Sequence, residues 1–284
     1  MNWKQTLFWS FSTAAIFYYF LLFGVFVFVG QEEMQLFIPE WWYIREFLFQ
    51  PGGFCAVAGQ WIIQYYRQPM SAVVLHTVLL VGCGFMVYRI LRCFSDKTYL
   101  LFLSLLPVLY LVKMSIHGEY LVDGTVGVVL MLLALSVSLK VRRAGSIAGY
   151  GIASTLLLSG LTGLLSVCYA FLYTLLALLR YKTSRQRLAA AACLIPALFI
   201  YLFSGWLGIP VPLSDGWMPE AYLEIQRLPH YYMYRVWTFF TLSIVGVALF
   251  ARFVPVIGEK SKWMDRVALV VCLITALVSI RFCL

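Results

Sequence analysis

Charged residues are scarce in this sequence. They make up 12% of the 284 residues, whereas hydrophobic residues make up 63%; a soluble domain usually has about a quarter charged residues. So many apolar side chains exceed what one soluble core can bury, and they occur in long blocks. The alternation over about ten residues that is typical of membrane β-barrels is absent. The composition therefore predicts an all-α, polytopic helical membrane protein.

The chain also lacks the usual cysteine motifs and any boundary between domains. Its seven cysteines form no Cys-x-x-Cys pair and are odd in number, so we expect packing residues and neither a zinc site nor a disulfide framework. There is no internal repeat, low-complexity tract or linker, which predicts a single membrane domain over residues 1–284. The chain stops at "SIRFCL", directly after an apolar block, which leaves open that it is the N-terminal part of a longer protein.

The apolar blocks predict about nine transmembrane helices. They cover roughly residues 7–30, 71–91, 98–113, 122–139, 145–160, 163–179, 188–207, 237–253 and 266–282, and each is about long enough to cross about 30 Å of hydrocarbon. The first block lacks a small-residue cleavage site, so we interpret it as a span and not as a signal peptide. The short fifth and sixth blocks share the linker "LSGLTGLL" and form either a tight hairpin or a partly re-entrant pair.

Basic residues are unevenly distributed between the two sets of loops. With a cytoplasmic N-terminus, fifteen of the 21 Lys and Arg residues lie in inner segments and six in outer segments. The positive-inside rule therefore predicts a protein of the bacterial inner membrane with its N-terminus in the cytoplasm. The net charge of +9 is then mostly cytoplasmic anchoring. We expect no nucleic-acid partner, because no basic stripe alternates with stacking aromatics in a soluble domain.

The predicted outer loops cover residues 31–70, 114–122 and 208–236, and the first of them is unusually rich in aromatic residues. "PEWWYIREFLFQ" (39–50) begins with Pro and Glu and ends before "PGG" (51–53), and "FCAVAGQWIIQYYRQP" (54–69) follows. Each segment is too short to span a membrane and is rich in Trp and Tyr, which favour the headgroup level. We expect two helices lying in the outer interface. The alternative is a cap that packs against the helical bundle.

Two adjacent acids, Glu32 and Glu33, follow the first predicted span. The order of a first span, an acidic pair, two interfacial helices broken by glycines and a return span resembles the start of the membrane-embedded glycosyltransferases of the GT-C fold. The run "QEEMQLF…PGG…QYYRQP" is also similar to a family of uncharacterised bacterial multi-pass membrane proteins. The first resemblance implies a polyprenyl-phosphate sugar donor and a catalytic or metal-binding acid at Glu32 or Glu33, although the GT-C family usually places Asp there.

Physical chemistry gives a separate reason to consider the acidic pair. A carboxylate at the edge of the hydrocarbon loses hydration, which favours a role as general base, and unpaired acids at such a depth are usually functional. Adjacent helical residues point about 100° apart, so only one of the two can face a given pocket. The alternative is that both form the solvated end of the span.

Two further outer segments carry candidate substrate-binding residues. The segment "KMSIHGEYLVDGT" (113–125) contains His117, Glu119 and Asp123, which could orient an acceptor or supply ligands to a divalent metal. The last outer loop ends in Arg227, His230 and Arg235 among four aromatics, a set that suits a lipid-linked phosphate. Ordinary solvated loops and an aromatic belt with snorkelling Arg are the alternatives.

These observations predict a membrane glycosyltransferase that uses a polyprenyl-phosphate-linked sugar on the outer face. Glu32 or Glu33 would be the catalytic base, and the expected partners are membrane lipids and the polyprenyl-phosphate lipid. The alternative is a non-enzymatic component, either a scaffold subunit or a transporter of lipid or solute. A pump-like transporter is disfavoured because His76 is nearly alone among ionisable residues in the middle of a predicted span.

Overall fold

The computed structural model describes residues 3–34, 37–117, 120–163, 165–203, 231–253, 265 and 267–272. Within these ranges the chain is helical and contains no β-strand, as predicted. It divides into two compact units, each built from segments that are distant in the sequence. Unit 1 comprises Met1–Gln35, Ile63–Tyr120 and Phe239–Leu284, and unit 2 comprises Leu36–Ile62 and Leu121–Thr238.

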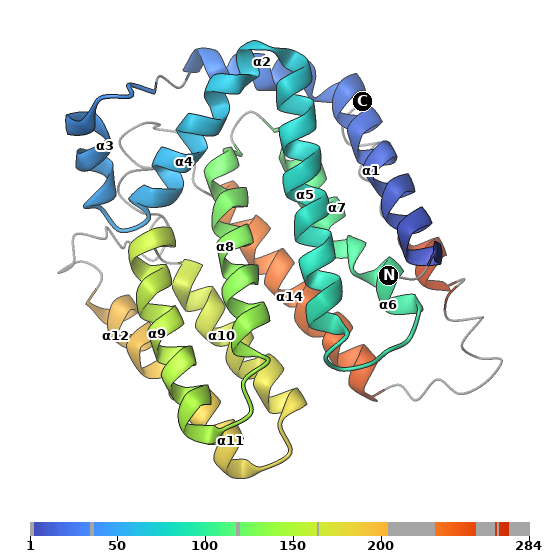
Figure 1. The fold of residues 1–284 in the computed structure, drawn as a ribbon, viewed down its shortest axis with the longest axis vertical. Coiled ribbons are helices and arrows are strands. Elements are labelled where there is room, and N and C mark those ends of the chain that lie inside the picture. Colours follow the sequence, from blue (N-terminus) through green and yellow to red (C-terminus); the bar gives the residue numbers. More distant parts are fainter. Residues whose placement is uncertain are drawn as a thin grey trace. The chain divides into compact units, whose positions relative to one another are not determined.

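Unit 1 begins with a long, nearly continuous helix. Its helices are α1 (Trp3–Phe23), α2 (Val25–Met34), the short 3₁₀ helix η1 (Gln64–Arg67), α5 (Pro69–Leu91), α6 (Tyr99–Leu103) and α7 (Leu105–Met114) (Figure 1). The backbone hydrogen bonds from Gly24 N to Phe20 O and from Phe28 N to Gly24 O continue across the junction of α1 and α2. The helix therefore runs past the predicted end of the first span at residue 30, continues to Met34 and includes the acidic pair.

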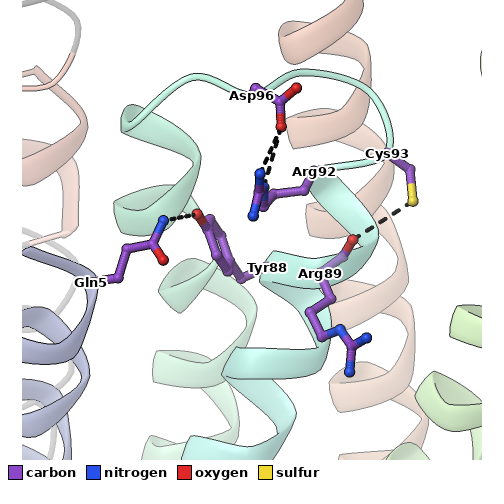
Figure 2. A network of polar contacts seen from close by, with 6 residues as sticks. All are labelled: Gln5, Tyr88, Arg89, Arg92, Cys93 and Asp96. Atoms are coloured by element: carbon purple, nitrogen blue, oxygen red, sulfur yellow. Dashed lines mark hydrogen bonds and ion pairs between the residues drawn. The ribbon is translucent and has the colours of Figure 1, made fainter. Parts of the chain in front are cut away.

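The helix α5 is the centre of unit 1, with α1, α2, α6, α7 and η1 packed against it. Pro69 occupies the first turn of α5, where its fixed φ suits a helix start and its missing N–H costs nothing. At the other end of α5, Gln5 of α1 donates a 2.9 Å hydrogen bond to the Tyr88 hydroxyl, and Arg92 forms a 3.0 Å ion pair with Asp96 (Figure 2). These contacts lie at the predicted cytoplasmic end of both helices.

Unit 2 contains the remaining helices of the first outer loop and the middle of the chain. These are α3 (Trp41–Leu48), α4 (Gly53–Ile63), α8 (Val122–Ser138), α9 (Ala144–Thr162), α10 (Leu165–Arg180), α11 (Ser184–Ala191) and α12 (Leu194–Leu202). The helices α8, α9 and α10 pack side by side (Figure 1). The turn between α9 and α10 has Gly163 at φ 61°, a conformation that favours glycine. The helices α9 and α10, which flank the linker "LSGLTGLL", pack against each other as a hairpin does.

A last long helix, α14 (Tyr231–Phe253), follows. From Phe239 onward it belongs to unit 1, where its rings lie against α6 and α7. The Tyr110 and Phe239 ring centroids are 4.2 Å apart, and those of Tyr99 and Phe250 are 5.7 Å apart.

Five helical segments are long and apolar enough to cross a membrane. They are Gln5–Phe23, Pro69–Leu91, Ala144–Thr162, Ser184–Leu202 and Val236–Phe253. Three shorter apolar helices, Tyr99–Ser115, Val122–Ser138 and Leu165–Arg180, coincide with three more predicted spans. The predicted count of nine is not confirmed, and most of the ninth predicted span lies outside the described residues.

The two helices of the first outer loop differ in burial. The helix α3 has no buried residue, whereas α4 buries one face through Cys55, Ala56, Gly59 and Gln60. The segment after the glycines is therefore helical as predicted, but it packs into unit 2 and resembles the cap that was the alternative. Its connection to α3 is anchored by Gly52, whose N–H donates a 3.0 Å hydrogen bond to the Gly160 carbonyl of α9.

Candidate functional site

The last turn of α2 places three consecutive polar residues on three different faces. One stripe of the α1–α2 helix faces the core of unit 1. Its buried residues include Phe20, Phe28 and Gln31. Glu32, about 100° further round, is half-buried, and Glu33 is exposed. The side chain that turns into unit 1 is therefore the amide of Gln31, which the sequence reasoning did not single out.

Gln31 joins the acidic end of α2 to the segment after α7. Its side chain is 1% exposed, and its Nε2 donates a 2.9 Å hydrogen bond to the backbone carbonyl of Tyr120. The Gln31 Oε1 is buried and accepts no hydrogen bond within the described residues. Because Tyr120 comes directly after Glu119 and three residues after His117, this bond ties the acid-bearing turn to the second predicted outer loop.

An aromatic cluster lies one turn below Gln31 and holds α2 against α5 and η1. The ring of His76 stacks on Phe28 with centroids 4.2 Å apart and an interplanar angle of 8°. The His76 Nε2 forms a 2.5 Å hydrogen bond with the Tyr66 hydroxyl. The Phe20 ring also contacts the His76 ring, with centroids 5.5 Å apart. His76 is thus a packed residue of the core of unit 1, with a buried Nδ1 that has no hydrogen-bond partner among the described residues.

Unit 2 contains a buried carboxylate, Asp123, in the first turn of α8. Its side chain is 3% exposed, and its Oδ1 has no hydrogen-bond partner in the described part of the chain. The oxygen fills the space beside Gly59 of α4, because a Cβ built on Gly59 would lie 1.8 Å from it. A glycine at position 59 is therefore what gives the carboxylate room.

Polar neighbours extend from Asp123 along α4. Burial raises the pKa of the Cys55 thiol, and the negative charge of Asp123 raises it further. Gln60 is 3% exposed and accepts a 3.1 Å hydrogen bond from the Tyr43 hydroxyl of α3 through its Oε1. Burial raises the pKa of Tyr43, the hydrogen bond to Gln60 lowers it, and Glu46 raises it again. This row of polar groups connects α3, α4 and α8 within unit 2.

The remaining predicted site residues are placed only in part. His117 is half-buried in the turn after α7, and Arg235 belongs to α14. Glu119, Arg227 and His230 lie outside the described residues. The acidic pair and His117 are in unit 1, whereas Asp123 and Arg235 are in unit 2. The convergence of all three outer segments on one cavity therefore stays a prediction.

A metal centre is not evident in the described ranges. No three His, Cys, Asp or Glu side chains described here lie close enough together to hold a metal ion. The predicted divalent metal also stays a prediction, because Glu119, one of its expected ligands, lies outside those ranges.

An apolar groove in unit 1 lies away from the acidic pair. It has a volume of about 600 Å³ and is lined by Trp3, Leu7, Phe8, Phe11, Ser12, Ala15, Ile16, Phe102, Leu105, Leu109, Leu269 and Cys272. From Ile16 to Gln31 the helix rises about 22 Å at about 1.5 Å per residue. The groove therefore cannot belong to a site formed by Gln31, Glu32 and Tyr120.

Sequence reasoning missed the residues that organise both polar regions. Gln31, Tyr66 and Gly59 carry no catalytic signature, and each acts through a partner outside its own helix. The best available signal was the polarity of Gln31 and Gln60 within otherwise apolar helical stripes.

These features define an all-helical protein with several helices suited to span a membrane and polar groups buried between them. The chain belongs to the family described as "Family of unknown function (DUF6057)", whose model matches residues 1–279. No curated protein and no solved structure matches it.

Proposed function

We propose that this chain is a membrane-embedded glycosyltransferase that takes a sugar from a polyprenyl-phosphate donor at the outer face of the bacterial inner membrane. The proposal keeps the cytoplasmic N-terminus and the nine spans predicted from the sequence. The observation that carries it is the hydrogen bond from Gln31 to Tyr120, because it brings the acidic turn of α2 to the segment that holds His117. The layout that resembles GT-C enzymes supports the same assignment.

In this proposal Glu32 is the general base. It is half-buried next to the fixed Gln31, whereas Glu33 is exposed, so Glu32 is the one of the two acids placed to contact a substrate held against unit 1. Glu32 removes the proton from the acceptor hydroxyl, and the acceptor oxygen bonds to the anomeric carbon of the sugar. The bond from that carbon to the phosphate oxygen breaks, and polyprenyl phosphate leaves. Arg227, His230 and Arg235 are proposed to hold the leaving phosphate, and His117, Glu119 and Asp123 to orient the acceptor.

The test compares two neighbouring acids that differ in burial. In a strain that lacks the protein, the sugar-charged polyprenyl phosphate should accumulate in lipid extracts, as measured by mass spectrometry. Wild type and Glu33→Gln should clear it, whereas Glu32→Gln should lower turnover by about 10²–10⁴-fold at equal protein abundance. Equal, mild effects of both substitutions, or no accumulation in the deletion strain, would count against a transferase.

A non-enzymatic transporter or scaffold is the second candidate. Its support is the pair of buried ionisable side chains, His76 and Asp123, each with one polar atom that has no hydrogen-bond partner in the described chain. Buried ionisable groups in membrane helices often mark ion or proton pathways. A transporter predicts that His76→Phe abolishes function while Glu32→Gln is tolerated, which is the reverse of the transferase pattern.

A further inference from the structure

The short helix α3 exposes an unusual amount of apolar surface. None of its residues is buried, and Trp41, Trp42 and the following Phe49 are 69%, 61% and 79% exposed. The contacts that attach α3 to the rest of unit 2 include the Tyr43–Gln60 hydrogen bond near its N-terminal end. They also include the Gly52–Gly160 hydrogen bond, which follows its C-terminal end. Aromatic side chains exposed to this degree favour a partner that is apolar on one side and wet on the other.

The same helix presents a hollow with one charge of each sign. The hollow has a volume of about 380 Å³ and is lined by Trp41, Trp42, Arg45, Glu46 and Phe49. The Arg45 guanidinium lies over the Phe49 ring, 5.6 Å from its centroid. Within the described residues the one ion pair is Arg92–Asp96, so neither Arg45 nor Glu46 is neutralised by a side chain there.

We propose that α3 binds the headgroup of a phospholipid that carries a primary amine, in the outer leaflet of the membrane. Arg45 contacts the phosphate, Glu46 accepts hydrogen bonds from the ammonium group, and the two Trp rings flank the headgroup. The apolar edges of Trp41, Trp42 and Phe49 then point toward the acyl chains. This inference depends on α3 lying at the membrane interface and is independent of transferase activity.

Charge complementarity selects this lipid over the alternatives. A purely anionic headgroup would leave Glu46 facing a second negative charge. A quaternary choline headgroup has the same net charge, but it has no N–H to donate to Glu46, although it still contacts Trp faces. Adjacent helical residues point about 100° apart, so Arg45 and Glu46 can reach the two ends of one zwitterion more easily than they can pair with each other.

The test measures binding of three lipids that share the same acyl chains and differ in the headgroup. Purified protein is titrated with phosphatidylethanolamine, phosphatidylcholine and phosphatidylglycerol, and bound lipid is counted by native mass spectrometry. Phosphatidylethanolamine should bind most tightly. Arg45→Gln should weaken its binding about fivefold, as expected for one basic side chain near a membrane surface. Glu46→Gln should remove the preference over phosphatidylglycerol.

Arg67 provides a matched control, because it is an exposed arginine of η1 with the same predicted outer location. Arg67→Gln should leave the lipid preference unchanged, and Arg45→Lys should largely retain it if Arg45→Gln folds poorly. Equal binding of the three lipids by wild type would overturn the proposal, as would an unchanged preference in both Arg45→Gln and Glu46→Gln. A dimer of this chain that is lost on Trp41→Ser/Trp42→Ser would also overturn it, since a second copy would then cover α3.

Discussion

At the scale of single residues, the contact between Gly59 and Asp123 is a tight steric constraint in unit 2. A Cβ on Gly59 would lie 1.8 Å from the Asp123 Oδ1 and 3.1 Å from its Cα, so both the carboxylate and the helix α8 oppose a larger residue. Asp123 itself is buried without a hydrogen bond to Oδ1, an arrangement that costs stability. A residue that costs stability and is given room by a glycine is a reasonable candidate for function.

We therefore expect Gly59→Ala to lower the free energy of unfolding by about 1–3 kcal/mol, as overpacking usually does. Asp123→Ala removes the clashing carboxylate, so the double variant should be more stable than the sum of the two single effects predicts. Fluorescence-detected size-exclusion chromatography after heating in detergent compares the stability of the single and double variants. Gly149→Ala, on α9 with nothing within 4 Å of the added Cβ, is the control. Strict additivity would show that the contact does not constrain folding.

Gln31 gives a second prediction at this scale. Gln31→Glu replaces the amide donor with a carboxylate facing the Tyr120 carbonyl, so it should cost about 1–3 kcal/mol, the usual cost of leaving a buried polar group unsatisfied. The melting temperature of the purified protein reports the loss. Gln68→Glu, at an exposed position before α5, should have almost no effect. A Gln31→Glu protein as stable as wild type would mean that this bond does not fix the end of α2.

At the scale of helices, composition and periodicity were sufficient for most of the fold. Long apolar blocks predicted the all-helical architecture, and the Gly-rich linker allowed the hairpin at Gly163. The first predicted span ends at residue 30, and the helix continues through Gln31, Glu32 and Glu33 to Met34. Gln31 is buried by a hydrogen bond to a residue 89 positions away, and no local pattern encodes such a contact.

In the first outer loop, too, the sequence predicted the helices but not their long-range contacts. Its two helices were predicted from the breaker "PGG" and from short aromatic-rich segments, and both exist. The burial of α4 was not predictable, because Cys55 and Gly59 are buried by contacts with α8, which begins some sixty residues later. Amphipathicity alone could not distinguish a helix at the membrane interface from one packed into the protein.

A labelling experiment separates the two helices. In native membranes a cysteine at Trp42 of α3 should react slowly with a water-soluble maleimide, because the exposed face is expected to lie in lipid. A cysteine at Glu40, exposed just before α3, should react quickly on the same side of the membrane. Similar fast rates at both positions would show that α3 faces water, and would remove the basis for lipid binding at Arg45.

At the scale of the whole molecule, the charge distribution makes a prediction about topology. Basic residues lie at helix ends in each unit: Arg89 and Arg92 at the end of α5 in unit 1, and Arg142 and Arg143 before α9 in unit 2. The hydrogen bond between Gln5 and Tyr88 (Figure 2) ties the first turns of α1 to that end of α5. The N-terminus and the basic end of α5 must therefore lie on the same side of the membrane, whichever side that is.

The positive-inside rule assigns that side to the cytoplasm. Reporter fusions after Lys97, Arg143 and Arg187 should all give a cytoplasmic signal, and fusions after Gln68 and His117 should give a periplasmic one. The natural Cys93, exposed after α5, offers an independent measurement, since in intact cells it should react with a membrane-permeant maleimide but not with an impermeant one. Periplasmic signals at any two of the three basic sites would show that the protein has the opposite orientation in the membrane. Glu32 would then face the cytoplasm, where a transferase at the outer surface could not use it.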